Sequence, residues 1–150
     1  MLEKPACAGR NVGDKKETLL YSDCFKTKTS NTHAERLSLL GQEISRVIEK
    51  FKPETLSIET LFLTTNHKTV MYVSEARGVI LYEAAKHNLS IFEYSPPQIK
   101  SAVTGDGHAD KKSIIKMVPL LIKLEKEVKH DDEYDAIAVG LTYFANNKVK

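Results

Sequence analysis

The clearest periodic pattern in the chain is an apolar stripe with three- and four-residue spacing. Its members are Leu37, Leu40, Ile44, Val47, Ile48 and Phe51. Such a stripe is typical of a helix that turns one face toward a core. Thr32 and Glu35 precede it with the spacing of a capping box, and Lys52-Pro53 follows it. The pattern predicts a helix from about residue 33 to residue 51.

Three shorter segments have the alternation, or the β-branched and aromatic content, that is typical of strands. They cover residues 18–25, 56–62 and 89–94. A helix from Asn66 to about Asn88 separates the last two, and a strand–helix–strand unit predicts that these two strands are parallel. Small residues in this helix are expected to let it approach a neighbour closely; they are Ala76, Gly78, Ala84 and Ala85.

The remaining segments predict shorter helices and loops. We expect a loop over residues 1–16, a short helix over residues 98–103, and a solvated loop or frayed turn over residues 123–130. Asp110 is the predicted N-cap of a further helix, and Pro119 should kink or end it because proline removes a backbone hydrogen bond. A last helix should begin with Asp131 as its N-cap. These elements together predict a mixed α/β fold.

Composition narrows the class of protein only slightly. The chain has 150 residues, of which 41% are hydrophobic, and 22 basic against 20 acidic residues give a net charge of +2. We expect one domain over residues 1–150. Cys7 and Cys24 have no zinc-ligand spacing, so reduced thiols are expected. No apolar run approaches the roughly 20 residues that span a bilayer, and no signal-peptide core is present, which predicts a cytoplasmic protein without a membrane anchor.

Three acidic residues suggest chemistry. Glu59 lies near the end of a predicted strand, where open α/β sheets usually place their active sites. Asp132 and Asp135 are three residues apart and project from the same side of the last predicted helix. One interpretation is that the two aspartates have no further role than their favourable electrostatic interaction with the helix dipole at its N-terminus. However, the apolar segment that follows, residues 136–140, must be buried, so the aspartates should lie at the rim of a core.

Three carboxylates without nearby histidine or cysteine ligands predict a hard-oxygen site. Such a site suits Mg²⁺ or Mn²⁺. Two such ions held about 4 Å apart can activate a water molecule and stabilise the leaving oxygen of a phosphodiester.

The chain resembles the RuvC family of Holliday junction resolvases in five strings. They are Ile58-Glu59-Thr60-Leu61-Phe62, Glu75-Ala76-Arg77-Gly78-Val79, Phe92-Glu93-Tyr94-Ser95-Pro96, Val103-Thr104-Gly105-Asp106-Gly107-His108-Ala109-Asp110-Lys111 and Asp132-Glu133-Tyr134-Asp135-Ala136. The resemblance runs in order over about residues 17–146. It implies a ribonuclease H-like mixed sheet flanked by helices, and a Mg²⁺-dependent endonuclease in which Mn²⁺ can substitute. It also implies a homodimer that cuts four-way DNA junctions in recombination and repair, with RuvA and RuvB as partners.

The resemblance also assigns residues. Glu59, Asp132 and Asp135 match catalytic metal ligands of the family. Phe62 matches an aromatic that stacks on bases opened at the junction, although the residues alone favour a core phenylalanine.

The basic residues that match the family are Lys100, Lys111 and Arg77. The two lysines match positions that approach DNA, and Lys112 and Lys116 extend the same basic strip; the alternative is ordinary solvated lysines. For Arg77, a buried or dimer-interface role competes with a DNA contact.

The N-terminal segment departs from the family. RuvC proteins begin with a strand carrying a Gly-Ile-Asp-Pro-Gly type motif, whose aspartate is a further metal ligand, and residues 1–16 contain no such motif. Met1–Lys4 resembles the tail of the family's second strand. We therefore expect the first strand and most of the second to be missing, as in an N-terminally truncated resolvase. The alternatives are a catalytically silent module that binds junction DNA and, more remotely, an unrelated ribonuclease H-like protein.

Overall fold

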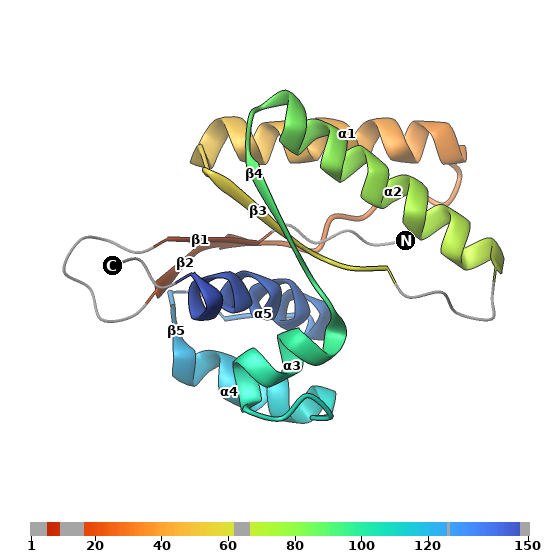
Figure 1. The fold of residues 1–150 in the computed structure, drawn as a ribbon. Coiled ribbons are helices and arrows are strands. Elements are labelled where there is room, and N and C mark those ends of the chain that lie inside the picture. Colours follow the sequence, from red (N-terminus) through yellow and green to blue (C-terminus); the bar gives the residue numbers. More distant parts are fainter. Residues whose placement is uncertain (1–5, 10–16, 62–66, 126, 148–150) are drawn as a thin grey trace. The chain divides into compact units, whose positions relative to one another are not determined.

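The computed structural model describes residues 6–9, 17–61, 67–125 and 127–147 (Figure 1). Its contacts divide the chain into two compact units. The first holds the described residues of Phe25–Leu56 and Leu61–Phe92, and the second holds those of Lys4–Cys24, Ser57–Thr60 and Glu93–Lys150. The expectation of one domain over residues 1–150 stays a prediction.

The first unit contains two long helices, α1 (His33–Phe51) and α2 (His67–Lys86), which pack against each other (Figure 1). The predicted capping box is present, because the Thr32 side chain accepts a hydrogen bond from the Glu35 amide and the Glu35 carboxylate accepts one from the Thr32 amide at 2.7 Å. Most of the predicted apolar stripe is buried, namely Leu40, Ile44, Val47 and Ile48. The predicted helix is confirmed.

Small residues bring α1 and α2 together. A Cβ added at Gly41 would lie 3.3 Å from a valine methyl group of α2, so a side chain there would push the helices apart. Ala76 and Ala84 are buried in α2, as predicted. Gly78 and Ala85 are exposed on the other side of the helix, so they take no part in this contact, and for them the expectation stays a prediction.

Strands β3 (Thr55–Glu59) and β4 (Ser90–Tyr94) pair with each other and continue from the first unit into the second. The Ser90 amide donates to the Glu54 carbonyl at one end, and the Thr60 amide donates to the Tyr94 carbonyl at the other. Both strands therefore run in the same direction, as the strand–helix–strand pattern predicted. Glu59 is the last residue of β3.

The second unit contains a sheet of three strands in the order β1 (Ala6–Gly9), β2 (Glu17–Ser22) and β5 (Ile122–Leu124). β1 is antiparallel to β2, and β5 is parallel to it. Two expectations were wrong here, because β1 lies in the segment taken as a loop over residues 1–16 and β5 overlaps the loop expected over residues 123–130. Both short strands obtain their backbone hydrogen bonds from β2, which local sequence cannot reveal.

Three helices complete the second unit: α3 (Pro96–Thr104), α4 (Lys111–Leu121) and α5 (Asp131–Asn146). α3 begins two residues before the predicted start because proline is well tolerated in a first helical turn. It ends at Gly105, whose φ of +83° favours glycine. Asp110 caps α4 as predicted, and α4 ends two residues after Pro119.

α5 packs against α3, α4, β1 and β2. The core on its inner face includes Ile137, Ala138, Val139 and Leu141. The predicted N-cap was wrong: His130 occupies that position without a side-chain cap, and Asp131 is the first helical residue. No helix within the described residues is long and apolar enough to cross a membrane.

We expect the buried side chain of Ile122 in β5 to contribute strongly to the free energy of unfolding. Ile122 is 1% exposed, whereas Leu120, two residues earlier, is 62% exposed. Ile122→Ala should lower the free energy of unfolding by about 2–5 kcal/mol, because it leaves a cavity. The matched truncation Leu120→Ala should change it by less than about 0.5 kcal/mol. Urea titration followed by circular dichroism measures both, and equal effects would contradict the assigned core.

Candidate functional site

Two aspartates in the first turns of α5 share one lysine. The Lys111 Nζ lies 3.3 Å from Asp132 Oδ1 and 3.1 Å from Asp135 Oδ2. All three side chains are roughly half exposed, so the cluster lies at the surface of the second unit. The predicted pairing of the aspartates on one face of a helix is observed, with an ammonium group between them.

The start of α4 places this lysine. Lys111 is the first residue of α4, directly after the N-cap Asp110. The Asp110 carboxylate accepts hydrogen bonds from the Ser113 amide at 2.8 Å and the Ser113 hydroxyl at 2.7 Å. These bonds hold the pKa of Asp110 below its ordinary value. A well-formed cap therefore fixes the backbone from which Lys111 extends toward α5.

Glu59 lies close enough to this cluster to sense its charge. Partial removal from water raises the pKa of Glu59, the negative charge of Asp135 raises it further, and the positive charge of Lys100 lowers it. Lys100 extends from α3. The second unit therefore brings Glu59, Asp135 and Lys100 into one electrostatic neighbourhood, although they are far apart in sequence.

The two aspartates also change the pKa of Lys111. Partial burial lowers the pKa of Lys111, but its bonds and attraction to Asp135 and Asp132 outweigh that cost, so the net pKa is raised. The ammonium form is thus stabilised by the two carboxylates that it bridges.

The acid pair has the chemistry of a divalent-cation site. Carboxylate oxygens are the preferred ligands of Mg²⁺ and Mn²⁺, and the Lys111 ammonium shows that a cation fits between Asp132 and Asp135. The described residues contain no group of three acidic, histidine or cysteine side chains that could hold one ion together. Glu59 is therefore coupled to the pair by charge, and the prediction that it shares a metal with them remains a prediction.

The other candidate DNA-binding residues fall in different places. Lys112 and Lys116 are exposed on α4, and Lys100 is half-buried on α3, so the basic strip belongs to the second unit. Arg77 lies on α2 in the first unit. Phe62 lies outside the described residues.

Sequence reasoning missed one buried contact beside the acids. The Ser22 hydroxyl at the end of β2 donates a hydrogen bond to the Glu133 carboxylate of α5 at 2.5 Å. The two residues are 1% and 3% exposed. A signal for the burial of Glu133 exists in the sequence, because it is four residues before Ile137 and eight before Leu141, on the same face of the helix. No local signal identifies Ser22 as its partner.

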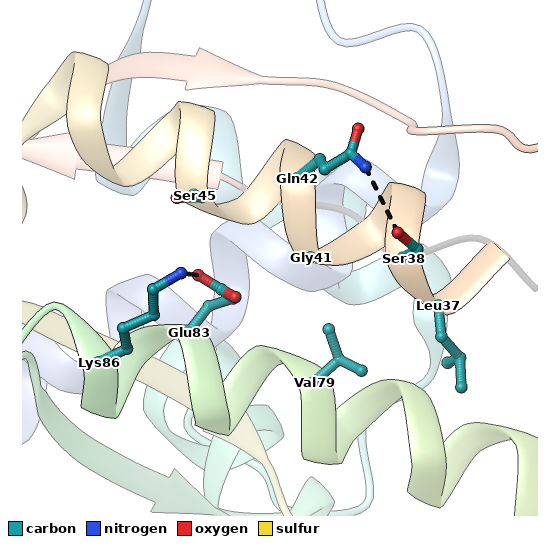
Figure 2. A pocket seen from close by; sticks show the side chains of 8 residues that line it. All are labelled: Leu37, Ser38, Gly41, Gln42, Ser45, Val79, Glu83 and Lys86. Carbon is teal, nitrogen blue, oxygen red and sulfur yellow. Dashed lines mark hydrogen bonds and ion pairs between the residues drawn. The ribbon is translucent and has the colours of Figure 1, made fainter. Parts of the chain in front are cut away.

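A hollow between α1 and α2 in the first unit has a volume of about 420 Å³ (Figure 2). Its lining is Leu37, Ser38, Gly41, Gln42, Ser45, Val79, Glu83 and Lys86. Its polar groups already have partners, since Lys86 pairs with Glu83 at 3.3 Å, Gln42 donates to Ser38, and Ser45 donates to Glu49. The hollow therefore offers no evident chemistry.

Comparison with known proteins identifies relatives over most of the chain. A family model described as crossover junction endodeoxyribonuclease RuvC matches residues 9–143. The RuvC protein of Alkaliphilus oremlandii is 42% identical over 131 residues, which cover 87% of this chain and 79% of the relative. That of Pseudothermotoga lettingae is 41% identical over 121 residues, which cover 81% and 75%.

Solved structures agree with these relatives. The chain is similar to Thermus thermophilus RuvC, with a TM-score of 0.80 over 93% of this chain and 84% of the other. The similarity to the same protein in complex with a Holliday junction substrate has a TM-score of 0.85 over 94% and 85%. Sequence identity is 26% in both cases. The α/β, ribonuclease H-like fold class is confirmed.

The raised pKa of Glu59 predicts a stability cost that depends on pH. Its ionised form is disfavoured in the folded protein, so the cost is absent below the ordinary glutamate pKa of about 4.3 and grows as the pH rises through the higher folded pKa. Glu59→Gln removes the charge. It should raise the melting temperature at about pH 8 relative to the unsubstituted protein, and change it little at about pH 4.

Glu54→Gln is the matched control, because Glu54 is an exposed acid just before β3. Calorimetric melting of the three proteins without divalent ions measures the effect. A lower melting temperature for Glu59→Gln at the higher pH would contradict the assigned repulsion.

Proposed function

This chain belongs to the RuvC family of crossover junction endodeoxyribonucleases, and from that premise we propose that it cuts four-way DNA junctions by hydrolysing phosphodiesters at its acid cluster. The observation that carries the proposal is that Asp132 and Asp135 together bind a positive group, the Lys111 ammonium, beside Glu59, whose pKa responds to the charge of Asp135. A phosphodiester and its leaving oxygen are anionic, so a cluster of acids can serve this reaction only through bound cations.

The family consists of nucleases that depend on a divalent metal, and we propose Mg²⁺, with Mn²⁺ as a substitute. Asp132 and Asp135 would hold it, with Glu59 on the adjoining strand end. When bound, the ion would supply charge neutralisation for the phosphate and activation of the attacking water. The hard oxygen donors of these residues support this choice of metal.

Lys111 would change partners during this reaction. Its ammonium pairs with Asp132 and Asp135. A divalent ion held by those carboxylates would supply their charge neutralisation in its place, and the long flexible stem of Lys111 would then allow the ammonium to turn to a DNA phosphate. Lys100 stays beside Glu59, where its charge favours the ionised carboxylate that the site requires.

DNA binding would rest on the basic strip of the second unit. Lys100 and Lys111 contact phosphates near the acids, and the exposed Lys112 and Lys116 extend this contact along the backbone. We also propose that Phe62 stacks on an unpaired base and that Arg77 contacts DNA. These last two assignments rest on the family pattern alone.

We further propose that the protein acts as a homodimer in the cytoplasm, together with RuvA and RuvB. A two-fold symmetric junction suits a two-fold symmetric enzyme. Exposed apolar side chains on α2 support a self-association surface: Met71 and Tyr82 are 62% and 65% exposed, and both lie on the face of Gly78. A Cβ at Gly78 would meet nothing within 4 Å, which leaves room for a second chain.

The nuclease assignment predicts that a substitution in the acid cluster can abolish junction cleavage without weakening junction binding. Glu59→Gln should lower the rate of junction cleavage at least about a hundredfold, since loss of even an outer-shell metal partner costs up to that much. Junction binding in the presence of Ca²⁺ should change less than about twofold, because only one exposed carboxylate is altered. Gel assays with a synthetic four-way junction measure both, with Glu54→Gln as the control that retains both properties.

Equal loss of binding and cleavage in Glu59→Gln would make Glu59 structural instead. A junction that the unsubstituted protein binds but leaves uncut at every Mg²⁺ and Mn²⁺ concentration would replace the nuclease by a silent binding module.

The proposed dimer surface predicts a change in mass. Tyr82→Glu should convert a dimer to a monomer at micromolar concentration, because it places a charge among buried apolar contacts. Light scattering after size exclusion measures the molar mass. Leu120→Glu introduces the same charge at an equally exposed apolar residue of α4 and should leave the dimer intact. A dimer that survives Tyr82→Glu would place the interface elsewhere.

A further inference from the structure

The helix that carries the two aspartates, α5, begins without a side-chain N-cap bond. A helix begins with backbone amides that lack partners inside the helix, and a side chain at the N-cap normally binds one of them. Thr32 serves α1 in this way, and Asp110 serves α4. α5 begins at Asp131, and the His130 side chain at its N-cap makes no cap bond. Its first turn therefore needs another constraint to hold Asp132 and Asp135 in place.

Glu133 provides such a constraint. It is the third residue of α5, and its carboxylate is almost fully removed from water. A buried carboxylate is costly unless hydrogen bonds satisfy it. The Ser22 hydroxyl, itself 1% exposed, donates to Glu133 Oε2 at 2.5 Å. The bond joins residues 111 positions apart and attaches the uncapped turn to the end of β2.

Helix geometry relates this bond to the aspartates. With about 100° between successive residues, Asp132 and Asp135 project about 60° apart, and Glu133 projects about 100° from Asp132 and about 160° from Asp135. Glu133 thus points inward while the aspartates point toward Lys111. Fixing the Glu133 side chain fixes the rotation of the first turn about the helix axis, and with it the direction of both aspartates.

We propose that Ser22 and Glu133 are positioning residues that set the divalent-cation affinity of Asp132 and Asp135. This inference rests on the metal site of the proposed function and adds two residues that do not touch the ion. Partners that hydrogen-bond a metal ligand directly change metal affinity by about 10- to 100-fold. The Ser22–Glu133 bond acts on the ligands only through the backbone of α5, so we expect an effect at the lower end of that range.

The Ser22–Glu133 bond differs from an ordinary buried hydrogen bond because its loss should affect the cation site as well as the stability of the fold. Thr142 is a second buried hydroxyl on the same helix, seven residues or about two turns after Asp135, and it donates to the Ala138 carbonyl. Loss of either hydroxyl should destabilise the fold, but only loss of the Ser22 hydroxyl should affect the cation site. Thr142 is therefore the matched control.

The first experiment measures Mn²⁺ binding without DNA, by electron paramagnetic resonance of the free ion. Ser22→Ala should weaken binding about tenfold, whereas Thr142→Val should change it less than twofold. In a Glu133→Met background, Ser22→Ala should have less than a twofold effect, because the bond is already absent. A merely structural role would not produce this dependence on Glu133.

A second measurement does not require the metal. Hydrogen exchange of the amides of Asp135, Ala136 and Ile137, which close the first turns of α5, should accelerate about tenfold in Ser22→Ala. In Thr142→Val these amides should exchange at the native rate.

Native exchange rates and native Mn²⁺ affinity in a folded Ser22→Ala protein would overturn the inference, as would equal weakening by Thr142→Val. If the unsubstituted protein shows no saturable Mn²⁺ binding that Asp135→Asn removes, the proposed metal site fails instead. The exchange rates then still decide whether the bond holds the first turn.

Discussion

The second unit depends on α5 meeting two opposite demands within a few residues. Its inner face must be dry, and Ile137 and Ala138 are 2% and 0% exposed. Its first turns keep Asp132 and Asp135 about half exposed to solvent. Because a helix is rigid over this length, the boundary between core and solvent is set by its rotation about its own axis. Within the second unit, that one orientation sets which α5 side chains face α3, α4, β1 and β2 and which face solvent.

The acid cluster contains an unfavourable repulsion between carboxylates. Asp135 and Glu59 repel each other, as the raised pKa of Glu59 indicates, and exposure to solvent weakens the repulsion without removing it. Lys111 and Lys100 offset part of this cost. Unfavourable local interactions of this kind are common at functional sites, and the rest of the fold has to be stable enough to hold the repelling groups in place.

Sequence revealed the elements whose causes are local. The helix over residues 33–51 follows from its stripe and capping box. Alternation predicted a strand that contains Glu59, although β3 ends at Glu59 and not at residue 62. The short strands β1 and β5 were missed because their stability comes from pairing with β2. The acid residues could be chosen by type, spacing and family resemblance. Lys111 bridging the aspartates and Ser22 reaching Glu133 depend on contacts 21 or more residues apart, which no periodicity encodes.

Charge in the cluster also explains why one lysine can have two roles. Three ionised carboxylates and two ammonium groups leave one net negative charge, which repels a phosphodiester. A divalent ion at the proposed site would supply enough positive charge to reverse that sign, and it would weaken the attraction between Lys111 and the two aspartates. The flexible stem of Lys111 would allow its ammonium to turn to a phosphate at little cost. The pairing of Lys111 with the acids and its proposed contact with DNA are therefore compatible.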